Sequence, residues 1–340
     1  MVAEEDYYGD LLKGEIKDIL ERDYDKGEFF APIRRMDDYI NDYEMRRDEE
    51  GDERDYELKS ELEIQPLEPI GGEMEIAAVD ASLAILGETD RGVVAAFRVA
   101  IAYSEAERPI EVYEYITHLT ENSRLIYEKL SGLLGSQREY TGSLNRMPYR
   151  IMNLLERIAQ RRACSQVKDG IILWDGSITR TMETTWEIYN GAFKIARRNN
   201  NIIISISKRS RLRLIDGRKI TMILDDHPGA HLSHIHHLLP ERIQRDLYGV
   251  VHVAKFREDG FTFRVDVVPI EGVSCCEAIR RLAGAASFVN GYPAALREAH
   301  IHAYFTRWEV VALQSIALDR FDLKPMDIFD VRTHILGPFR

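Results

Sequence analysis

Two short apolar runs that each end in an aspartate constrain the fold more than any other feature of the sequence. Residues 76–79 (Ile-Ala-Ala-Val) precede Asp80, residues 171–174 (Ile-Ile-Leu-Trp) precede Asp175, and a small residue follows each aspartate. Apolar runs of this length are typical of strands buried in a sheet. We therefore predict that both carboxylates project at the carboxyl ends of buried strands, where clustered acidic groups can bind a divalent metal ion.

A third acidic residue, Glu156, precedes the second run on a helix predicted over residues 147–163. The buried stripe of this helix is defined by Ile151, Leu154, Leu155 and Ile158. Glu156 lies at the margin of that stripe, so its carboxylate can reach toward the strand ends. Each acid also has an ordinary structural interpretation: Asp80 as a turn residue, Asp175 as a helix N-cap, Glu156 as a solvated charge. The residues alone leave both interpretations open.

Beyond residue 75 the sequence predicts strands first and then helices in alternation with strands. Strands over residues 75–86, 91–103 and about 109–115, with a turn at 87–92, form an antiparallel meander. After the meander we predict helices over about 119–134, 147–163, 181–198, 274–288 and 294–314, strands over 170–174 and 201–207, and further strands around a histidine-rich insert within 218–270. This order predicts an α/β fold, with a mixed sheet flanked by helices.

The first 65 residues differ from the rest of the chain in charge. They hold 23 acidic and 10 basic side chains, whereas the remaining residues hold 34 and 35. Loose helical spacing of apolar residues between Tyr7 and about Tyr43 predicts a helical arm, followed by the charged stretch 46–55. We therefore divide the chain into an acidic helical arm with its linker (1–65) and a main domain (66–340). Three interpretations of the arm stay open: it packs on its own body, it binds a partner, or it extends into solvent.

A basic stretch interrupts the nearly neutral main domain. Its members are Arg197, Arg198, Lys208, Arg209, Arg211, Arg213, Arg218 and Lys219. Such a stretch can contact phosphates or can form a solvated face. Both interpretations stay open.

The bulk composition bounds the class of protein. A chain of 340 residues with 45% hydrophobic content can bury the core of one large domain. It has no run of 18 apolar residues, and its acidic start lacks the order of a signal peptide, so we expect a cytoplasmic protein with no membrane partner. Cys164, Cys275 and Cys276 form neither a disulfide framework nor a zinc-type spacing, and we predict reduced core residues.

Four segments in a fixed order resemble the NurA family of archaeal and bacterial nucleases. They are the Asp80 segment, Trp174-Asp175-Gly-Ser177, Ile204-Ser-Ile-Ser-Lys208 and Gly291-Tyr-Pro-Ala-Ala-Leu-Arg-Glu-Ala-His300, with Glu156 at a suitable spacing before Asp175. The match runs from about residue 75 to 310 and excludes the N-terminal arm. One departure is Ala81, where the family more often has Gly, a residue that permits closer approach to a metal.

The resemblance implies an RNase H-like domain that degrades DNA. It implies 5′ to 3′ exonuclease and single-strand endonuclease activity on single- and double-stranded DNA, with two Mn²⁺ ions, or Mg²⁺ in their place. It also implies a homodimer that works in DNA end resection and repair with a hexameric HerA-type DNA-translocating ATPase. The chain contains no GxxxxGK[ST] motif for ATP, so such a motor would be a separate protein.

Site roles follow from the resemblance, position by position. Asp80, Glu156 and Asp175 match the metal-binding acids, and Lys208 lies in a strand-end lysine motif. His300 matches a histidine of the closing helix, with a role in metal ligation or proton transfer. Asp266 is an additional candidate ligand.

Helix geometry adds that His300 and His302 cannot both face one metal cluster, because two residues turn a helix by about 200°. The motif match selects His300.

A second group of potential ligands competes with these residues. It consists of Asp225, Asp226, His227, His231, His234, His236 and His237. His227 and His231 would share a face of a helix and hold zinc, as in a zinc-dependent hydrolase, but Pro228-Gly229 interrupts a helix there and the HExxH order is absent. A surface loop near DNA or a partner is the favoured interpretation.

A noncatalytic DNA-binding adaptor of the same ATPase is the alternative to a nuclease; Ala81 and the acidic arm motivate it.

Overall fold

A computed structural model describes most of the main domain and part of the arm. The described residues are 7–22, 32–35, 56–58, 62–105, 107–180, 185–208, 210, 212–214 and 217–325. Arg209, Arg211 and the charged stretch 46–55 lie outside them, as do parts of the predicted arm helix and the first residues of the helix predicted over 181–198.

The centre of the fold is a mixed sheet built on three long strands and two shorter ones. β4 (Ile76–Thr89), β5 (Gly92–Tyr103) and β6 (Glu111–Thr120) form the predicted antiparallel meander. β7 (Ile171–Asp175) pairs parallel with β4, and β8 (Ile202–Ser207) pairs parallel with β7. An antiparallel meander continued by parallel strands is the mixed sheet of the predicted RNase H-like α/β fold, which is thereby confirmed.

Antiparallel strands extend the sheet beyond β8. β12 (Thr262–Val267) pairs with β8, β11 (Val250–Lys255) with β12, β10 (His231–His234) with β11, and β3 (Gln65–Pro66) with β10. At the other edge β4 also pairs with β1 (Pro32–Arg35), which pairs with β15 (Lys324–Pro325). Two small pairs lie outside this sheet: β2 (Tyr56–Leu58) with β9 (Leu212–Leu214), and β13 (Phe288–Val289) with β14 (Tyr292–Pro293).

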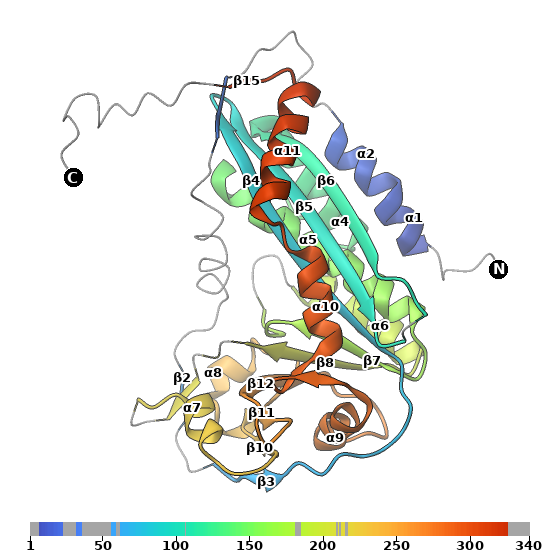
Figure 1. Cartoon of the computed structure of the whole chain (residues 1–340), viewed down its shortest axis with the longest axis vertical. Helices are drawn as coiled ribbons and strands as arrows, with labels where there is room; N and C mark the ends of the chain where they lie inside the picture. The colour runs from blue at the N-terminus through green and yellow to red at the C-terminus, as the bar shows by residue number, and fades with distance from the viewer. Residues whose placement is uncertain are drawn as a thin grey trace.

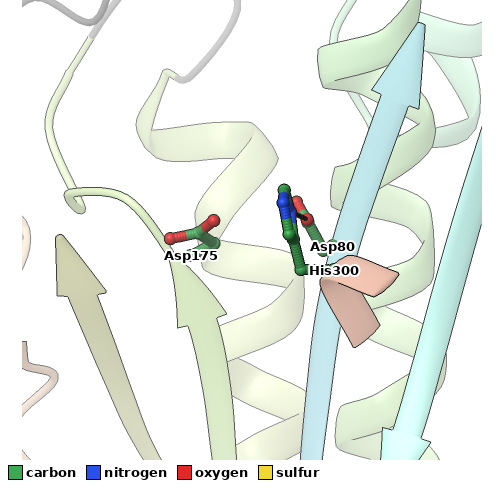
Figure 2. Close-up of side chains that lie close together, drawn as sticks. All are labelled: Asp80, Asp175 and His300. Carbon is green, nitrogen blue, oxygen red and sulfur yellow. Dashed lines mark hydrogen bonds and ion pairs between the residues drawn. The ribbon is translucent and has the colours of Figure 1, made fainter. Parts of the chain in front are cut away.

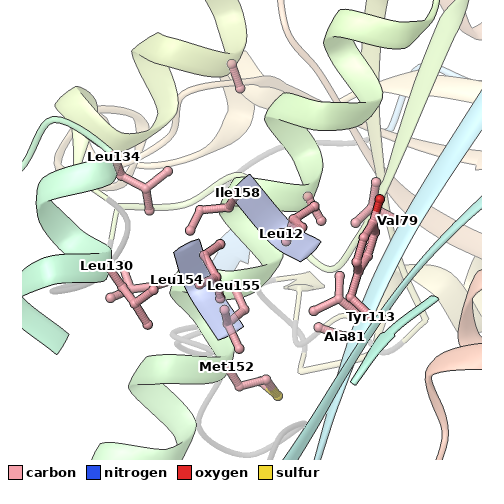
Figure 3. Packing of buried hydrophobic residues seen from close by; sticks show 14 of the residues in the cluster. Leu12, Val79, Ala81, Tyr113, Leu130, Leu134, Met152, Leu154, Leu155 and Ile158 are labelled. Atoms are coloured by element: carbon pink, nitrogen blue, oxygen red, sulfur yellow. The ribbon is translucent and has the colours of Figure 1, made fainter. Parts of the chain in front are cut away.

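Helices cover both faces of the sheet. On one face, here called the α5 face, Ala77, Val79 and Ala81 of β4 lie in one apolar cluster with the stripe of α5 (Met147–Gln166). The same cluster takes in α4 (Arg124–Leu133) and α6 (Trp186–Arg198). Figure 3 shows Val79 and Ala81 of β4 with residues of α4 and α5. Because side chains alternate along a strand, the residues between these positions point to the opposite face.

That opposite face, the α10 face, carries the C-terminal helices. Ile76 and Ala78 of β4 lie in a cluster with α9 (Cys275–Ala285) and α10 (Ala294–Ala303). Further along β4, Ala84 and Leu86 meet α11 (Arg307–Arg320). Figure 1 shows α10 and α11 crossing the sheet.

The predicted helix over 294–314 is wrong as a single element, because the chain leaves helical geometry at Tyr304. A new helix starts after Thr306, whose hydroxyl accepts from the Glu309 N–H while the Glu309 carboxylate accepts from the Thr306 N–H. This capping box supplies partners for the backbone N–H groups that a helix start exposes.

The insert between β8 and β12 also holds short helices that the sequence analysis did not predict: α7 (Ile220–Asp225) and α8 (Glu241–Gln244).

The described part of the N-terminal arm packs on the body. α1 (Tyr7–Lys13) and α2 (Glu15–Glu21) bury Leu12, Ile16 and Leu20 completely, and the Tyr115 hydroxyl donates to the Leu12 carbonyl over 2.6 Å. The interpretation of residues 7–21 as a solvated extension is therefore wrong. Residues 32–35, inside the predicted arm helix, form strand β1 instead. The division of the chain at residue 65 stays a prediction.

The structure also bears on the predictions for the cysteines and for membrane-spanning helices. All three cysteines are free, and Cys164 is buried as predicted. Cys275 and Cys276 are half-buried at the start of α9, so the prediction that they are core residues is wrong. Among the residues that the structure describes, none of the helices has the length and apolar character to span a bilayer.

Candidate metal centre

Asp175 stands where β7 ends. The next residue, Gly176, has a φ of +90°, a conformation that glycine adopts at low cost, and its N–H donates to the Ile206 carbonyl. The chain thus turns away directly after the aspartate and leaves its carboxylate at the carboxyl end of the strand, as predicted. Alternation from Ile171 and Leu173, which face α9 and α10, places Asp175 on the α10 face.

Asp80 does not end a strand, which corrects the prediction for this residue. β4 continues to Thr89 because its other edge pairs with β5 along most of its length. Its pairing with β7, however, runs only from Ile76↔Ile171 to Val79↔Trp174. Asp80 is therefore the first residue past the point where the two strands part, level with Asp175 and on the same α10 face.

The side chain of Asp80 is almost completely buried, with 1% of its surface exposed. Its Oδ2 lies 2.7 Å from His300 Nδ1, and its Oδ1 accepts from the Ala81 N–H over 2.9 Å. Because an ionised carboxylate only accepts, the Nδ1 of His300 carries the hydrogen in this contact. In a neutral imidazole with this tautomer, Nε2 has the lone pair that can bind a cation or accept a proton.

One atom from each of Asp80, Asp175 and His300 lies within 4.8 Å of the other two, and this is the sole such ligand group found among the described residues. Figure 2 shows Asp175 across a narrow gap from the Asp80–His300 pair. Two carboxylate oxygens with an imidazole nitrogen suit Mg²⁺, Mn²⁺ or Zn²⁺. Two neighbouring carboxylates, one of them buried, also favour a cation between them, so the donor set fits a divalent metal ion.

Two further side chains contact Asp175. Lys208 Nζ lies 3.0 Å from Asp175 Oδ2, and the Tyr292 hydroxyl lies 3.4 Å from Asp175 Oδ1. The Lys208 ammonium is also 5.4 Å from the centre of the Tyr292 ring, a cation–π distance. Lys208 follows β8, whose end lies beside that of β7, so the predicted strand-end lysine does reach the centre.

The sequence analysis assigned no role to Tyr292. Its signal was its place in the Gly291–His300 segment, since Pro293 directly after it is the N-cap of α10, the helix that carries His300. The hairpin β13–β14 and α10 thus bring a hydroxyl and an imidazole to the same centre.

Glu156 lies on α5, with 3% of its surface exposed and its Oε2 3.5 Å from Arg157 Nη2. α5 covers the face of the sheet opposite to the one that bears Asp80, Asp175 and His300. Within the described residues Glu156 is not in the ligand group. Its role as a ligand stays a prediction.

Asp266 has structural partners. Arg264 binds both of its carboxylate oxygens, at 2.8 and 2.9 Å, and the Ile178 N–H donates to Oδ2. This buried pair holds the backbone at Ile178, three residues after Asp175. The role of Asp266 as a ligand stays a prediction. Ala81 directs its methyl group into the core under α5 and not toward the centre. His302, as the helix geometry requires, is exposed while His300 meets Asp80.

The histidine-rich insert adopts another geometry. Residues 231–234 form strand β10, so the helical spacing on which the zinc interpretation relied is wrong. His234 stacks on the buried His252 of β11, with 4.8 Å between ring centres. Burial lowers the pKa of His252 to about 4, and it also lowers the pKa values of His231, His234 and His236.

The described members of the basic stretch lie at different parts of the sheet. Lys208 lies at the metal centre, whereas Arg197 and Arg198 end α6, the helix that returns the chain from the end of β7 to the start of β8. A crossover between parallel strands places the end of its helix at the opposite end of the sheet. Only part of the stretch is near the candidate centre.

The molecule is therefore an α/β protein whose mixed sheet carries a ligand group for a divalent cation on one face. No protein-family model and no curated protein matches the sequence. Among solved structures it is similar to the NurA nuclease from Sulfolobus solfataricus, at 14% identity over 84% of this chain and 91% of that one, with a TM-score of 0.47. It is also similar to a second NurA structure (10%, 83% and 96%, TM-score 0.45) and to the catalytic domain of human Endonuclease V (11%, 73% and 85%, TM-score 0.37).

Proposed function

We propose that the protein is a divalent-metal-dependent DNA nuclease. The observation that carries the proposal is the approach of ligand atoms from Asp80, Asp175 and His300 to within 4.8 Å of one another. A lysine beside an acidic cation site suits a substrate with negatively charged oxygens, such as a phosphodiester. The motif resemblance to the NurA family supports DNA as that substrate.

The chain's own residues account for binding and charge stabilisation at such a centre. Asp80 and Asp175 would hold the cation, with the free Nε2 of His300 as a third ligand or a proton acceptor. When bound, the cation supplies activation of water and neutralisation of the charge that develops at phosphorus. Lys208 attracts and orients the phosphate, and the Tyr292 hydroxyl fixes Asp175 by donating to it.

The finer properties rest on the motif resemblance. They are 5′ to 3′ exonuclease and single-strand endonuclease action in end resection and repair, Mn²⁺ as the ion, two ions per site, Glu156 as a further ligand, a homodimer, a HerA-type ATPase as partner and a cytoplasmic location. Glu156→Gln tests the ligand role, because a ligand's loss lowers Mn²⁺ affinity in a titration, whereas a structural residue's loss lowers only the melting temperature. Light scattering of the pure protein tests the dimer.

The decisive experiment is digestion of 5′-labelled and 3′-labelled single- and double-stranded DNA with Mn²⁺, Mg²⁺, Zn²⁺ or EDTA. Cleavage that requires the metal and disappears in Asp80→Ala and Asp175→Ala would support the nuclease and give its polarity. Wild-type cleavage by either variant would overturn the site. DNA binding without cleavage under any condition would favour the adaptor, and digestion should then be repeated with the ATPase present.

A further inference from the structure

A second feature of the same edge of the molecule is an exposed aromatic ring beside the candidate centre. Phe261 precedes β12, and 61% of its surface is exposed. Among the described residues, no other phenylalanine is classed as exposed. β12 runs antiparallel to β8, with Arg264 opposite Ser207. The start of β12 therefore lies next to the end of β8, from which Lys208 reaches Asp175.

A chain of contacts connects Phe263, two residues after Phe261, to the centre. The Tyr292 hydroxyl meets Asp175, and the Tyr292 ring lies 5.4 Å from the Phe263 ring. Phe263, Val265 and Val267 alternate onto the α10 face, and Phe261 stands directly before this strand. Phe261 thus lies at the end of the sheet that bears Lys208 and Asp175.

Two turns fix the backbone at Phe261 by close packing. The Phe261 N–H donates to the Asn290 carbonyl over 3.2 Å. A Cβ added at Gly260 would lie 2.7 Å from the Cα of Gly291, and Gly291 has a φ of +80°, so both glycines are required for the contact. Val289, which precedes Asn290 and pairs with Tyr292 across the hairpin, is also 42% exposed.

The turn before Phe261 carries Arg257 and the exposed acids Glu258 and Asp259, so it has no excess of positive charge to hold a phosphate against the ring. Lys208, which reaches Asp175, is the cation placed to meet the backbone. A strand with its phosphate at Lys208 would therefore meet Phe261 with a base and not with its backbone.

We infer that Phe261 is a stacking platform for an unpaired base next to the bound phosphate, and that it makes single-stranded DNA the preferred substrate. The inference rests on the proposed nuclease function and adds a specificity residue to it. Aromatic rings accept any base by its π-face, whereas a paired base presents only its edge, so the platform selects for single strands without selecting for sequence.

Binding of single-stranded oligonucleotides with 2-aminopurine at successive positions, in EDTA, tests the platform independently of cleavage. In the wild type one position should lose fluorescence by stacking. Phe261→Ala should abolish that quenching and weaken binding about 5- to 100-fold, Phe261→Leu should also lose the quenching, and Phe261→Trp should retain it. Trp308→Ala, which removes an exposed aromatic ring on α11, is the matched control and should bind as the wild type does.

Each outcome separates the two proposals. Metal-dependent cleavage together with unchanged quenching in Phe261→Ala would overturn the platform and leave the nuclease standing. Position-specific quenching that Phe261→Ala removes, without cleavage in any metal, would keep the platform and overturn the nuclease. Failure of the wild type to bind single strands, or equal affinity for duplex and single strands, would also overturn the platform. Circular dichroism of Phe261→Leu, which retains the apolar volume, guards against misfolding.

Discussion

The described part of the chain has two groups of metal-ligand side chains that differ in geometry, and one of them converges as a metal centre does. At the edge where β4 and β7 part, three residues from distant parts of the chain bring ligand atoms within 4.8 Å of one another. Around β10 and β11, neighbouring histidines pack ring against ring, and His252 among them is buried with a pKa lowered to about 4. Convergence of donor atoms, and not the number of histidines in a segment, therefore distinguishes a metal site from polar packing.

The largest expected effect is a difference in DNA cleavage between variants of the Asp80–Asp175–His300 group and variants of the histidines around β10 and β11. Asp175→Ala should lower the rate of DNA cleavage by at least about 1000-fold, because loss of a ligand removes several kcal/mol of charge stabilisation by the cation. His234→Ala should leave the rate within about threefold of wild type. Single-turnover cleavage with saturating Mn²⁺ measures both rates. Equal losses in the two variants would remove the distinction between the groups.

The buried histidines should instead govern stability in acid. A histidine whose folded pKa is depressed stabilises the fold above its unfolded pKa and loses that stabilisation as the pH falls through the folded pKa. For His252 the window is pH 6.5 to about 4, and the loss is on the order of 3 kcal/mol. Urea unfolding from pH 7 to 4.5 should show a steeper decline for the wild type than for His252→Gln. Parallel declines would refute a buried neutral imidazole.

His300 should have an intermediate effect, through the metal. His300→Ala should lower Mn²⁺ affinity about 10- to 100-fold, the range seen when a partner of a metal ligand is removed. His302→Ala, two residues away and exposed, is the control and should bind Mn²⁺ as the wild type does. Isothermal titration with Mn²⁺ gives the affinities. If His302→Ala weakened binding as much, the orientation of α10 would be wrong.

These contrasts also show what could be predicted from the sequence. Asp175 at a strand end was predictable, because its apolar run is short and a glycine follows. The position of Asp80 was not predictable, because β4 continues for nine more residues. Asp80 comes close to Asp175 because the pairing of β4 with β7 ends one residue before it. The contact of Tyr292 depends on the packing of a hairpin onto another turn, which no local pattern encodes. The break before Thr306 was predictable, since its capping box is written in the sequence.

The smallest effect tests whether the basic stretch acts as one surface. Lys208→Met should lower the slope of log binding constant against log salt by about 1, as expected for one lost phosphate contact. Arg197→Met removes the same charge at the far end of α6 and should leave the slope unchanged, because the site would lie more than a Debye length away. Fluorescence anisotropy with a labelled single strand at several salt concentrations, in EDTA, gives both slopes. A fall in both variants would mean that DNA follows the whole stretch around the molecule, so that the candidate centre is only one part of a longer binding track.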